Sequence, residues 1–425
     1  MKREENISGN LDWLTIALYA TLVTLGWLNI FAAVYDEEAT RSIFDLSINS
    51  GRQLLFIAAS IIIIIGIVVI DMRFYEAFGY IIYGIIIFML LLIPFIGKEV
   101  GGNKAWFGVG SFGIQPSEFA KFATALAVAK YIGSVGFRMD NMRQQMVLFG
   151  LIGLPMALIL LQKDFGTALV FTAFVIVFFR EGMSPFLIIV GVAAATIAIL
   201  TLVIKNQWYL HGAIISLVTL IILLGKKKWK RIMVLTAGAA IVMITIESFD
   251  YVVNEVLPVR HKKRLEALVD PDFDPMGINW NVTQSKIAIG SGGFWGKGFL
   301  QGTQTKFDFV PEQSTDFIFC TIGEEHGWIG TSLVLALFVA LLLRVIQIAD
   351  RQKNRFARAY GFSVFSIFFF HFAINIGMTI GLFPVIGIPL PFFSYGGSAL
   401  WSFTILLFIL LKLDAHRGQV LQRIS

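Results

Sequence analysis

The chain has 425 residues, of which 57% are hydrophobic and only 15% charged, and its mean hydropathy is +0.77. Soluble domains carry about 25% charged residues, so this composition excludes a soluble protein and indicates an integral membrane protein. The net charge of +6 does not indicate a nucleic-acid partner, because the basic residues fall in loops between apolar segments. A single cysteine, Cys320, excludes an intramolecular disulfide.

Apolar segments of roughly 17–25 residues recur along the chain, which is typical of transmembrane helices and not of β-barrel strands. We predict an all-α polytopic membrane protein in which residues 1–425 form a single membrane domain. The first segment is too long for a signal peptide and lacks a cleavage site, so we expect it to be retained. The expected spans are 13–35, 53–70, 77–96, 117–133, 146–162, 166–180, 186–204, 209–225, 231–249, 328–347, 360–381 and 396–412.

The distribution of Lys and Arg predicts the orientation of these spans. Basic residues concentrate in alternate loops, for example at 226–231 and 344–358, and such loops are cytoplasmic. Both termini are therefore predicted to be cytoplasmic, and residues 251–327 to form a large extracytoplasmic loop. Within that loop, residues 255–269 mix apolar and basic side chains, which predicts either a helix on the membrane surface or a solvated charged loop.

Several motifs resemble known sites but fail in detail. The run that begins at Asp270 starts like a calcium loop, but Pro275 stands where glycine is needed and Asn281 where glutamate is needed. A glycine-rich run at 290–297 lacks the spacing of a nucleotide-binding loop. The histidines are scattered without the spacing of zinc ligands. The sequence therefore indicates no certain cofactor.

Asp316 stands where the polar loop turns into an apolar helix. A carboxylate at a membrane surface is costly to keep there, which favours a functional role, although it would also suit a cap on the following helix. Glu118 and Lys121 lie three residues apart, on one face of the span at 117–133. They predict either a structural ion pair or a polar cavity. Asp164 lies at another helix junction, where a capping role and a substrate role are both open.

The long loop also carries polar side chains among many glycines. Glycines let backbone N–H groups approach an anion, and lysines add positive charge. Together these residues predict an outer site for a phosphorylated, lipid-linked molecule, although each lysine alone is more typical of a solvated surface than of a ligand. The candidates in the loop are Lys286, Lys297, Gln304, Lys306 and Glu312, and those outside it are Lys104 and Lys121.

Six short runs stand in a characteristic order along nearly the whole chain: QPSE at 115–118, DFGT at 164–167, QSKIAIGSGG at 284–293, PE at 311–312, TDFIF at 315–319 and PLPFFSYGG at 389–397. In this order they resemble the SEDS family of bacterial cell-wall proteins (shape, elongation, division and sporulation). The run GKG at 296–298 followed by GTQ at 302–304 resembles the elongation-type branch of that family.

The resemblance implies a peptidoglycan glycosyltransferase in the bacterial cytoplasmic membrane. It would polymerise lipid II into glycan strands on the outer face during elongation, with undecaprenyl diphosphate as the leaving group and a class B penicillin-binding protein among its elongation-complex partners. The family's catalytic aspartate falls on Asp316, the expected general base of an inverting transfer. A divalent cation that assists the diphosphate remains open. The alternatives are a lipid II flippase or other carrier of lipid-linked substrates, and a scaffold without activity.

This sequence departs from the family pattern in three places. The family core has about ten spans, so residues 209–249 are interpreted as an inserted transmembrane hairpin that leaves the sidedness unchanged. Ala105 precedes Trp106 where the family often has arginine, and Lys104 is the expected substitute. Ser314 stands where a histidine often precedes the Thr–Asp pair.

Overall fold

The computed structural model describes residues 11–36, 41–100, 103–109, 112–204, 206–225, 228–256, 259–269, 279–307 and 309–417. The chain divides into two compact units. The larger unit is drawn from Met1–Met183, Asn281–Gly381 and Val385–Ser425, and the smaller from Ser184–Trp280 and Leu382–Pro384.

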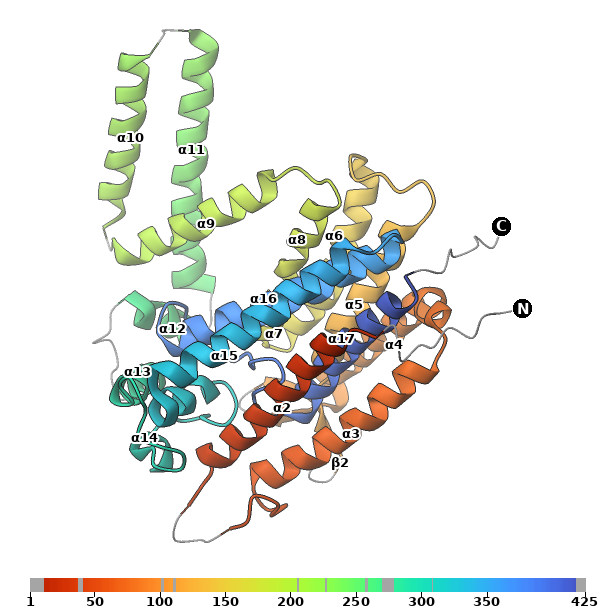
Figure 1. The fold of residues 1–425 in the computed structure, drawn as a ribbon. Coiled ribbons are helices and arrows are strands. Elements are labelled where there is room, and N and C mark those ends of the chain that lie inside the picture. The colour runs from red at the N-terminus through yellow and green to blue at the C-terminus, as the bar shows by residue number, and fades with distance from the viewer. Residues whose placement is uncertain are drawn as a thin grey trace. The chain divides into compact units, whose positions relative to one another are not determined.

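The larger unit is a bundle of long helices with short helices in its connections (Figure 1). Its helices are α2 (Trp13–Ala33), α3 (Asn49–Val69), α4 (Met72–Ile96), α5 (Pro116–Gly133), α6 (Met142–Leu161), α7 (Phe165–Val170), η1 (Phe171–Phe174), α8 (Val175–Arg180), α13 (Trp280–Ser291), α14 (Thr303–Lys306), α15 (Ile318–Asp350), α16 (Arg355–Thr379) and α17 (Gly397–Ala415).

Helix α5 lies in the interior of this unit and packs against α4, α6, α16 and α17. Its segment 123–129 alternates alanines with Thr124, Leu126 and Val128, and every one of these side chains is buried. Small side chains let neighbouring helices approach closely, which is how helices associate where the solvent is as apolar as their own surfaces. The sequence of α5 therefore suits a helix surrounded by protein rather than by lipid.

Nine of the described helices are long and apolar enough to cross a membrane, and the apolar helices Phe165–Arg180 and Ile188–Val203 are shorter. Helix α5 is not among them, because Glu118, Lys121 and Lys130 interrupt its apolar sequence. All the spans predicted from the sequence coincide with helices, although several helices begin earlier than expected. The prediction of an all-α polytopic membrane protein is thereby confirmed.

The largest difference lies at α15, which begins at Ile318, whereas we predicted a span only from residue 328. Gly327 interrupts this helix with φ 60° and ψ −155°, a backbone conformation that an L side chain rarely adopts. The predicted loop extends to this break at residue 327, but residues 318–326 are already helical. The predicted loop at 251–327 also contains α12, α13 and α14.

The connection between α4 and α5 forms a small antiparallel sheet in the order β1–β2–β3, which the sequence did not predict. Its strands are β1 (Lys98–Val100), β2 (Asn103–Val109) and β3 (Phe112–Ile114). Lys98 pairs with Trp106, and Phe107 pairs with Ile114. Three short strands with glycines among them carry too weak an alternating pattern to be recognised in isolation.

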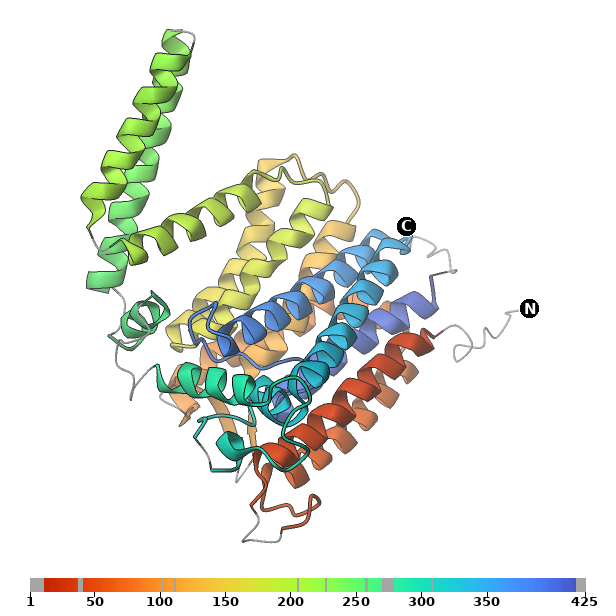
Figure 2. The same cartoon turned by 60° about the vertical axis from the view of Figure 1, so that its left-hand side comes forward.

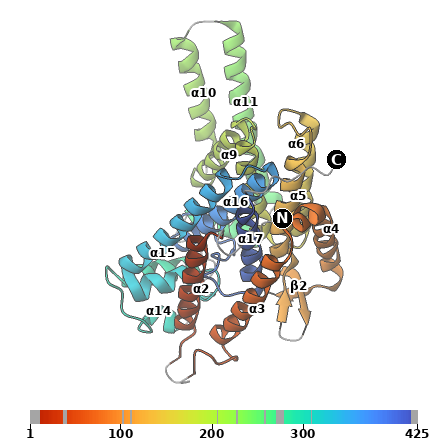
Figure 3. The ribbon, with the colours of Figure 1, turned by 45° about the vertical axis from the view of Figure 1, so that its right-hand side comes forward.

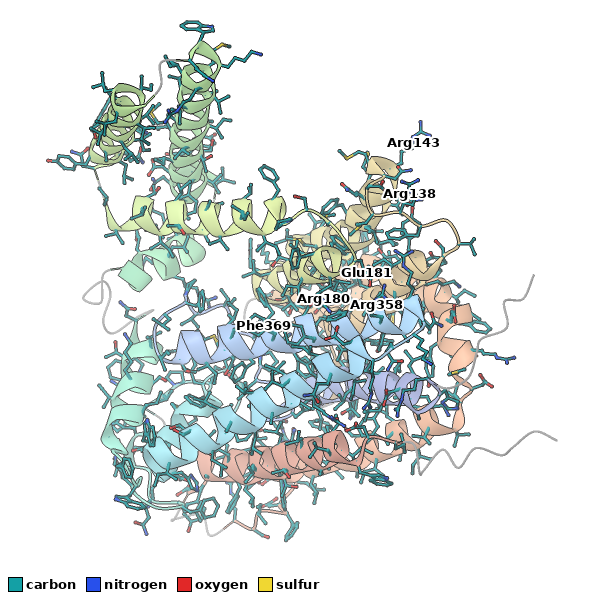
Figure 4. The ribbon with its side chains drawn as sticks, turned by 45° about the horizontal axis from the view of Figure 1, so that its top comes forward. Arg138, Arg143, Arg180, Glu181, Arg358 and Phe369 are labelled. Atoms are coloured by element: carbon teal, nitrogen blue, oxygen red, sulfur yellow. The ribbon has the colours of Figure 1, made fainter. Side chains whose placement is uncertain are left out.

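The two ends of the larger unit are formed by different elements. The sheet, α14 and the turn before α15 lie toward one end, and the start of α2 and the end of α17 lie toward the other (Figures 2 and 3). Ion pairs occupy this second end. Arg358 of α16 donates hydrogen bonds of 2.8 and 3.0 Å to Glu181, the C-cap residue just after α8, and the two side chains lie together in Figure 4.

The smaller unit contains α9 (Phe186–Val203), α10 (Gln207–Leu224), α11 (Trp229–Tyr251), the π-helical turn η2 (Val252–Val256) and α12 (Val259–Val269). Helices α10 and α11 pack against each other as the hairpin predicted at 209–249. That this hairpin is an insertion relative to the family core stays a prediction. The helix expected within 255–269 is present as α12, and its place on the membrane surface also stays a prediction.

Candidate functional site

Asp316 lies in a tight turn, residues 311–317, that leads directly into α15. The main chain of this turn is held by the segment 385–395, which we call the proline loop. Tyr395 N donates to Ser314 O at 2.9 Å, and Ser394 Oγ donates to Thr315 O at 2.7 Å. Because buried backbone groups need partners, these bonds fix the turn against the proline loop.

A third bond holds Asp316 itself. Asn375 of α16 is fully buried and donates from Nδ2 both to Asp316 O, at 2.9 Å, and to Ile388 O of the proline loop, at 2.8 Å. One amide group therefore joins the helix, the turn and the loop. The main chain at Asp316 is therefore held by a buried amide as well as by the proline loop.

The carboxylate of Asp316 is half-buried and lies beside Gly387. A Cβ atom built at Gly387 would lie only 3.2 Å from Asp316 Oδ2, and Gly387 has φ +70°. The N-cap position of α15 is Phe317, which makes no side-chain capping bond. The interpretation of Asp316 as the N-cap of this helix is therefore wrong.

Glu118 and Lys121 form the ion pair that their spacing predicts. Lys121 Nζ lies 2.8 Å from Glu118 Oε2, and both side chains are almost completely buried. The ammonium group also lies 3.0 Å from His371 Nε2 of α16 and 4.5 Å from the centroid of the Phe403 ring. A buried charge needs such partners, because its desolvation costs several kcal/mol.

Asp164 caps α7, as one of the two sequence interpretations holds. Its Oδ1 accepts a hydrogen bond from Thr167 N at 3.0 Å, and its Oδ2 accepts one from Gln115 Nε2 at 3.0 Å. The neighbouring Gly166 touches the proline loop, since a Cβ there would lie 2.3 Å from Ile386 O. The proline loop therefore adjoins both the Asp164 corner and Asp316.

The remaining predicted residues do not gather around Asp316 in one cluster. Lys297 Nζ lies 2.7 Å from Glu324 Oε1, and Gln304 N donates to the same oxygen at 2.8 Å. Glu324 has no exposed surface, so Lys297 and the main chain of Gln304 serve to satisfy a buried carboxylate. Lys104 Nζ donates to Pro94 O at 2.7 Å.

Glu312 and Lys286 lie closer to the turn and the proline loop. Glu312 Oε2 accepts a hydrogen bond from Thr315 Oγ1 at 2.9 Å, next to Asp316 in the chain. Lys286 is exposed on α13, and a Cβ at Gly381, just past the end of α16, would lie 2.6 Å from its Nζ. Lys286 is therefore an exposed lysine beside Gly381, where the chain leaves α16.

The sequence alone does not indicate His371, Asn375 and Glu324 as parts of the site. The histidines lack zinc-ligand spacing, and a lone histidine or asparagine within an apolar helix has no partner in the local sequence. A polar residue within a predicted span nevertheless indicates an interior contact, because polar groups inside a membrane protein usually contact one another. Among the described residues, no three His, Cys, Asp or Glu side chains gather as a metal site would require.

The fold and this site define an α-helical membrane protein with a buried polar network that adjoins a carboxylate at one end of its bundle. A model of the cell cycle proteins FtsW, RodA and SpoVE matches residues 12–218 and 209–419, so the chain belongs to this family.

Named relatives match over most of the chain. The chain is 31% identical over 431 residues to the peptidoglycan glycosyltransferase RodA of Treponema pallidum (strain Nichols), covering 96% of this chain and 98% of that one. It is 33% identical over 367 residues to the peptidoglycan glycosyltransferase MrdB of Escherichia coli (strain K12), covering 86% and 85%.

Two solved structures share the fold. One is a chain of a peptidoglycan synthase complex that coordinates polymerization and crosslinking, with a TM-score of 0.70 at 23% identity, over 96% of this chain and 99% of that one. The other is the rod shape determining protein RodA of Thermus thermophilus, with a TM-score of 0.62 at 23% identity, over 96% and 98%.

Proposed function

We propose that this chain is a peptidoglycan glycosyltransferase that polymerises lipid II into glycan strands during cell elongation. The names of its full-length relatives support this activity. The observation that carries the proposal is the carboxylate of Asp316, half-buried at the end of a turn that Asn375 and the proline loop hold in place. An oriented carboxylate at this position is what a general base requires.

In the proposed reaction, a sugar hydroxyl of one substrate attacks the anomeric carbon of another. The new glycosidic C–O bond forms as the bond to the lipid diphosphate breaks, and Asp316 takes the hydroxyl proton. Diphosphate leaves with its electron pair and needs little acid assistance. Because a single displacement inverts the anomeric carbon, one carboxylate base is sufficient.

The charge that develops on the diphosphate needs positive groups nearby. Lys121 and Lys297 are engaged with Glu118 and Glu324, so their charges are largely balanced within the protein. We propose Lys286 as the principal lysine for the diphosphate, because it is exposed beside Gly381 and lies outside those two ion pairs. A divalent cation would add charge if one binds with the substrate, but no step here depends on it.

We further propose that Asp316 faces the outer side of the bacterial cytoplasmic membrane and that both termini are cytoplasmic. The loop-charge pattern supports this orientation. A membrane-impermeant thiol reagent tests it, after Cys320 has been replaced by serine. Ser42→Cys, between α2 and α3, is expected to react on intact cells, and Asp140→Cys, between α5 and α6, only after permeabilisation.

The proposed partner is a class B penicillin-binding protein that crosslinks the new strands, together with other elongation-complex proteins. The structural relative within a peptidoglycan synthase complex supports a crosslinking partner.

The deciding experiment measures polymerisation of purified lipid II by this chain, alone and with its co-purified transpeptidase. Wild type is expected to make glycan strands, and Asp316→Asn to lose about 10²–10⁴-fold in rate while remaining folded, because positioned base catalysis contributes that much. Asp140→Asn is the matched control: Asp140 is an exposed carboxylate paired with Arg138, and its loss should leave the rate unchanged.

Polymerisation by Asp316→Asn at a rate near that of wild type would refute the assignment of the base. If wild type makes no polymer with an active partner present, the glycosyltransferase proposal fails. Movement of lipid II across sealed vesicles would then identify a flippase, and growth of cells that carry Asp316→Asn would favour a scaffold.

A further inference from the structure

His371 is a fully buried histidine that the proposed reaction does not use. It lies on α16 between three other segments of the larger unit. Its Nε2 lies 3.0 Å from Lys121 Nζ of α5, and its Nδ1 lies 3.0 Å from Pro389 O of the proline loop. The Phe403 ring of α17 packs edge-on against the imidazole at a centroid distance of 4.8 Å.

These contacts determine which ring nitrogen of His371 carries the proton. A carbonyl oxygen can only accept a hydrogen bond, so Nδ1 must donate to Pro389 O. In a neutral imidazole, Nε2 then has a lone pair and accepts from the Lys121 ammonium group. A second proton would point an N–H group at that ammonium, so the neutral ring is the form that satisfies both contacts.

The same face of α16 makes a second contact with the proline loop. Asn375 follows His371 by four residues, which places the two side chains one turn apart on the helix. Asn375 binds Ile388 O, and His371 lies against Pro389 O, so two adjacent carbonyls of the loop are attached to one helix face. Gly387 precedes them and lies against the carboxylate of Asp316.

We propose that His371 is a positioning residue that sets the proline loop against Asp316. Its Nδ1–H holds the loop at Pro389, and its Nε2 holds Lys121. The effect on turnover rests on the proposed function, whereas the effect on the loop does not. A misplacement of about 1 Å at a reacting group can lower a rate by about 10²-fold, so the loop contact bears directly on catalysis.

Two substitutions separate the two contacts. In His371→Asn, the side-chain amide nitrogen takes the place of Nδ1 and can still donate to Pro389 O, but nothing reaches Lys121. In His371→Gln, the amide oxygen takes the place of Nε2 and can still accept from Lys121, but the donor to Pro389 is lost. Ser366→Ala is the matched control, because Ser366 is buried on α16 and its hydroxyl donates within its own helix, to Phe362 O.

The first readout is hydrogen exchange at the amides of Leu390 and Tyr395, which donate to Ser394 Oγ and Ser314 O. We expect His371→Gln to accelerate exchange in 385–395 and in 311–317 by about tenfold or more, because Pro389 is released. His371→Asn and Ser366→Ala should exchange like wild type in these two segments. This readout requires no activity.

The second readout is the polymerisation kinetics of the same variants. We expect His371→Gln to lower kcat by about 10–100-fold with KM within about twofold, as loss of a positioning contact predicts. Unchanged exchange in 385–395 for His371→Gln would overturn the proposal. Equal acceleration throughout α5 and α16 would also overturn it, because it would mean a general packing role. If wild type fails to polymerise while the exchange results hold, only the proposed function fails.

Discussion

Lys121 carries a charge on a side chain with no exposed surface, so its partners must replace the water that it lacks. Glu118 supplies the opposite charge at 2.8 Å, His371 a neutral acceptor, and Phe403 the face of an aromatic ring. Removal of one member of a buried ion pair leaves an uncompensated charge, whereas replacement of both members by apolar side chains of similar size removes the problem.

We therefore expect Glu118→Leu to destabilise the protein by about 3–5 kcal/mol, and the double variant with Lys121→Met to recover most of that loss. Thermal unfolding of the detergent-solubilised protein, followed by tryptophan fluorescence, measures both. Additive destabilisation in the double variant would show that the two side chains are not coupled. Loss of polymerisation in a double variant of wild-type stability would indicate that the pair also serves the substrate.

At the scale of elements, the proline loop contacts several parts of the site. It meets α7 at Gly166, α16 at Asn375 and the Asp316 turn at Ser394. Irregular backbone within a membrane protein persists only where protein or a water-filled cavity satisfies its polar groups, and here the protein does so. Gly387 of this loop has φ +70°, and a Cβ built there would lie 3.2 Å from Asp316 Oδ2, the carboxylate proposed as the base.

Gly387→Ala should therefore lower polymerisation strongly in a protein that still folds. An alanine at this φ costs roughly 1–2 kcal/mol, and its Cβ would press on the carboxylate. The control is Gly153→Ala on α6, where a Cβ meets nothing within 4 Å and activity should be unchanged. Normal turnover by Gly387→Ala would mean that the contact with Asp316 is not part of the working site.

At the scale of the whole larger unit, an ionic cluster ties together helix ends that are far apart in the chain. Asp12 at the start of α2 accepts hydrogen bonds from Arg344 at 2.6 Å and from Arg351 at 3.0 Å, and Arg351 also pairs with Asp414 near the end of α17. Burial by itself would raise the pKa of Asp12, but the hydrogen bonds from Arg344, Thr15 and Arg351 outweigh it and hold the pKa below its ordinary range.

A lowered pKa in the folded state means that the stabilisation by Asp12 is complete above the pKa of an unfolded aspartate, about 3.9, and is lost as the pH falls further toward the folded pKa. We expect the melting temperature of wild type to fall below about pH 4, and that of Asp12→Asn to fall less steeply from a lower starting point. Asparagine is also a good N-cap, so this substitution isolates the charge. If the melting temperatures of the two proteins fell with pH to the same extent, the stabilising role of the Asp12 charge would be contradicted.

Local sequence was sufficient for much of this protein. The spans follow from runs of apolar residues, because a helix in lipid must satisfy its own backbone and present apolar side chains along its whole length. The Glu118–Lys121 pair follows from a spacing of three residues on one helix, and the cap by Asp164 from its place before α7. Asp316 could be singled out because it is a carboxylate at the boundary between a polar loop and an apolar helix.

Tertiary structure decided which of these residues work together. Lys121 and His371 are 250 residues apart, and Asn375 reaches Asp316 across 59 residues. Structure also showed that Lys297 is engaged with Glu324, that Phe317 occupies the N-cap of α15, and that Gly327 bends this helix. Apolar periodicity records that a residue is buried but not what lies opposite it, because the partner is chosen by the packing of helices distant in sequence.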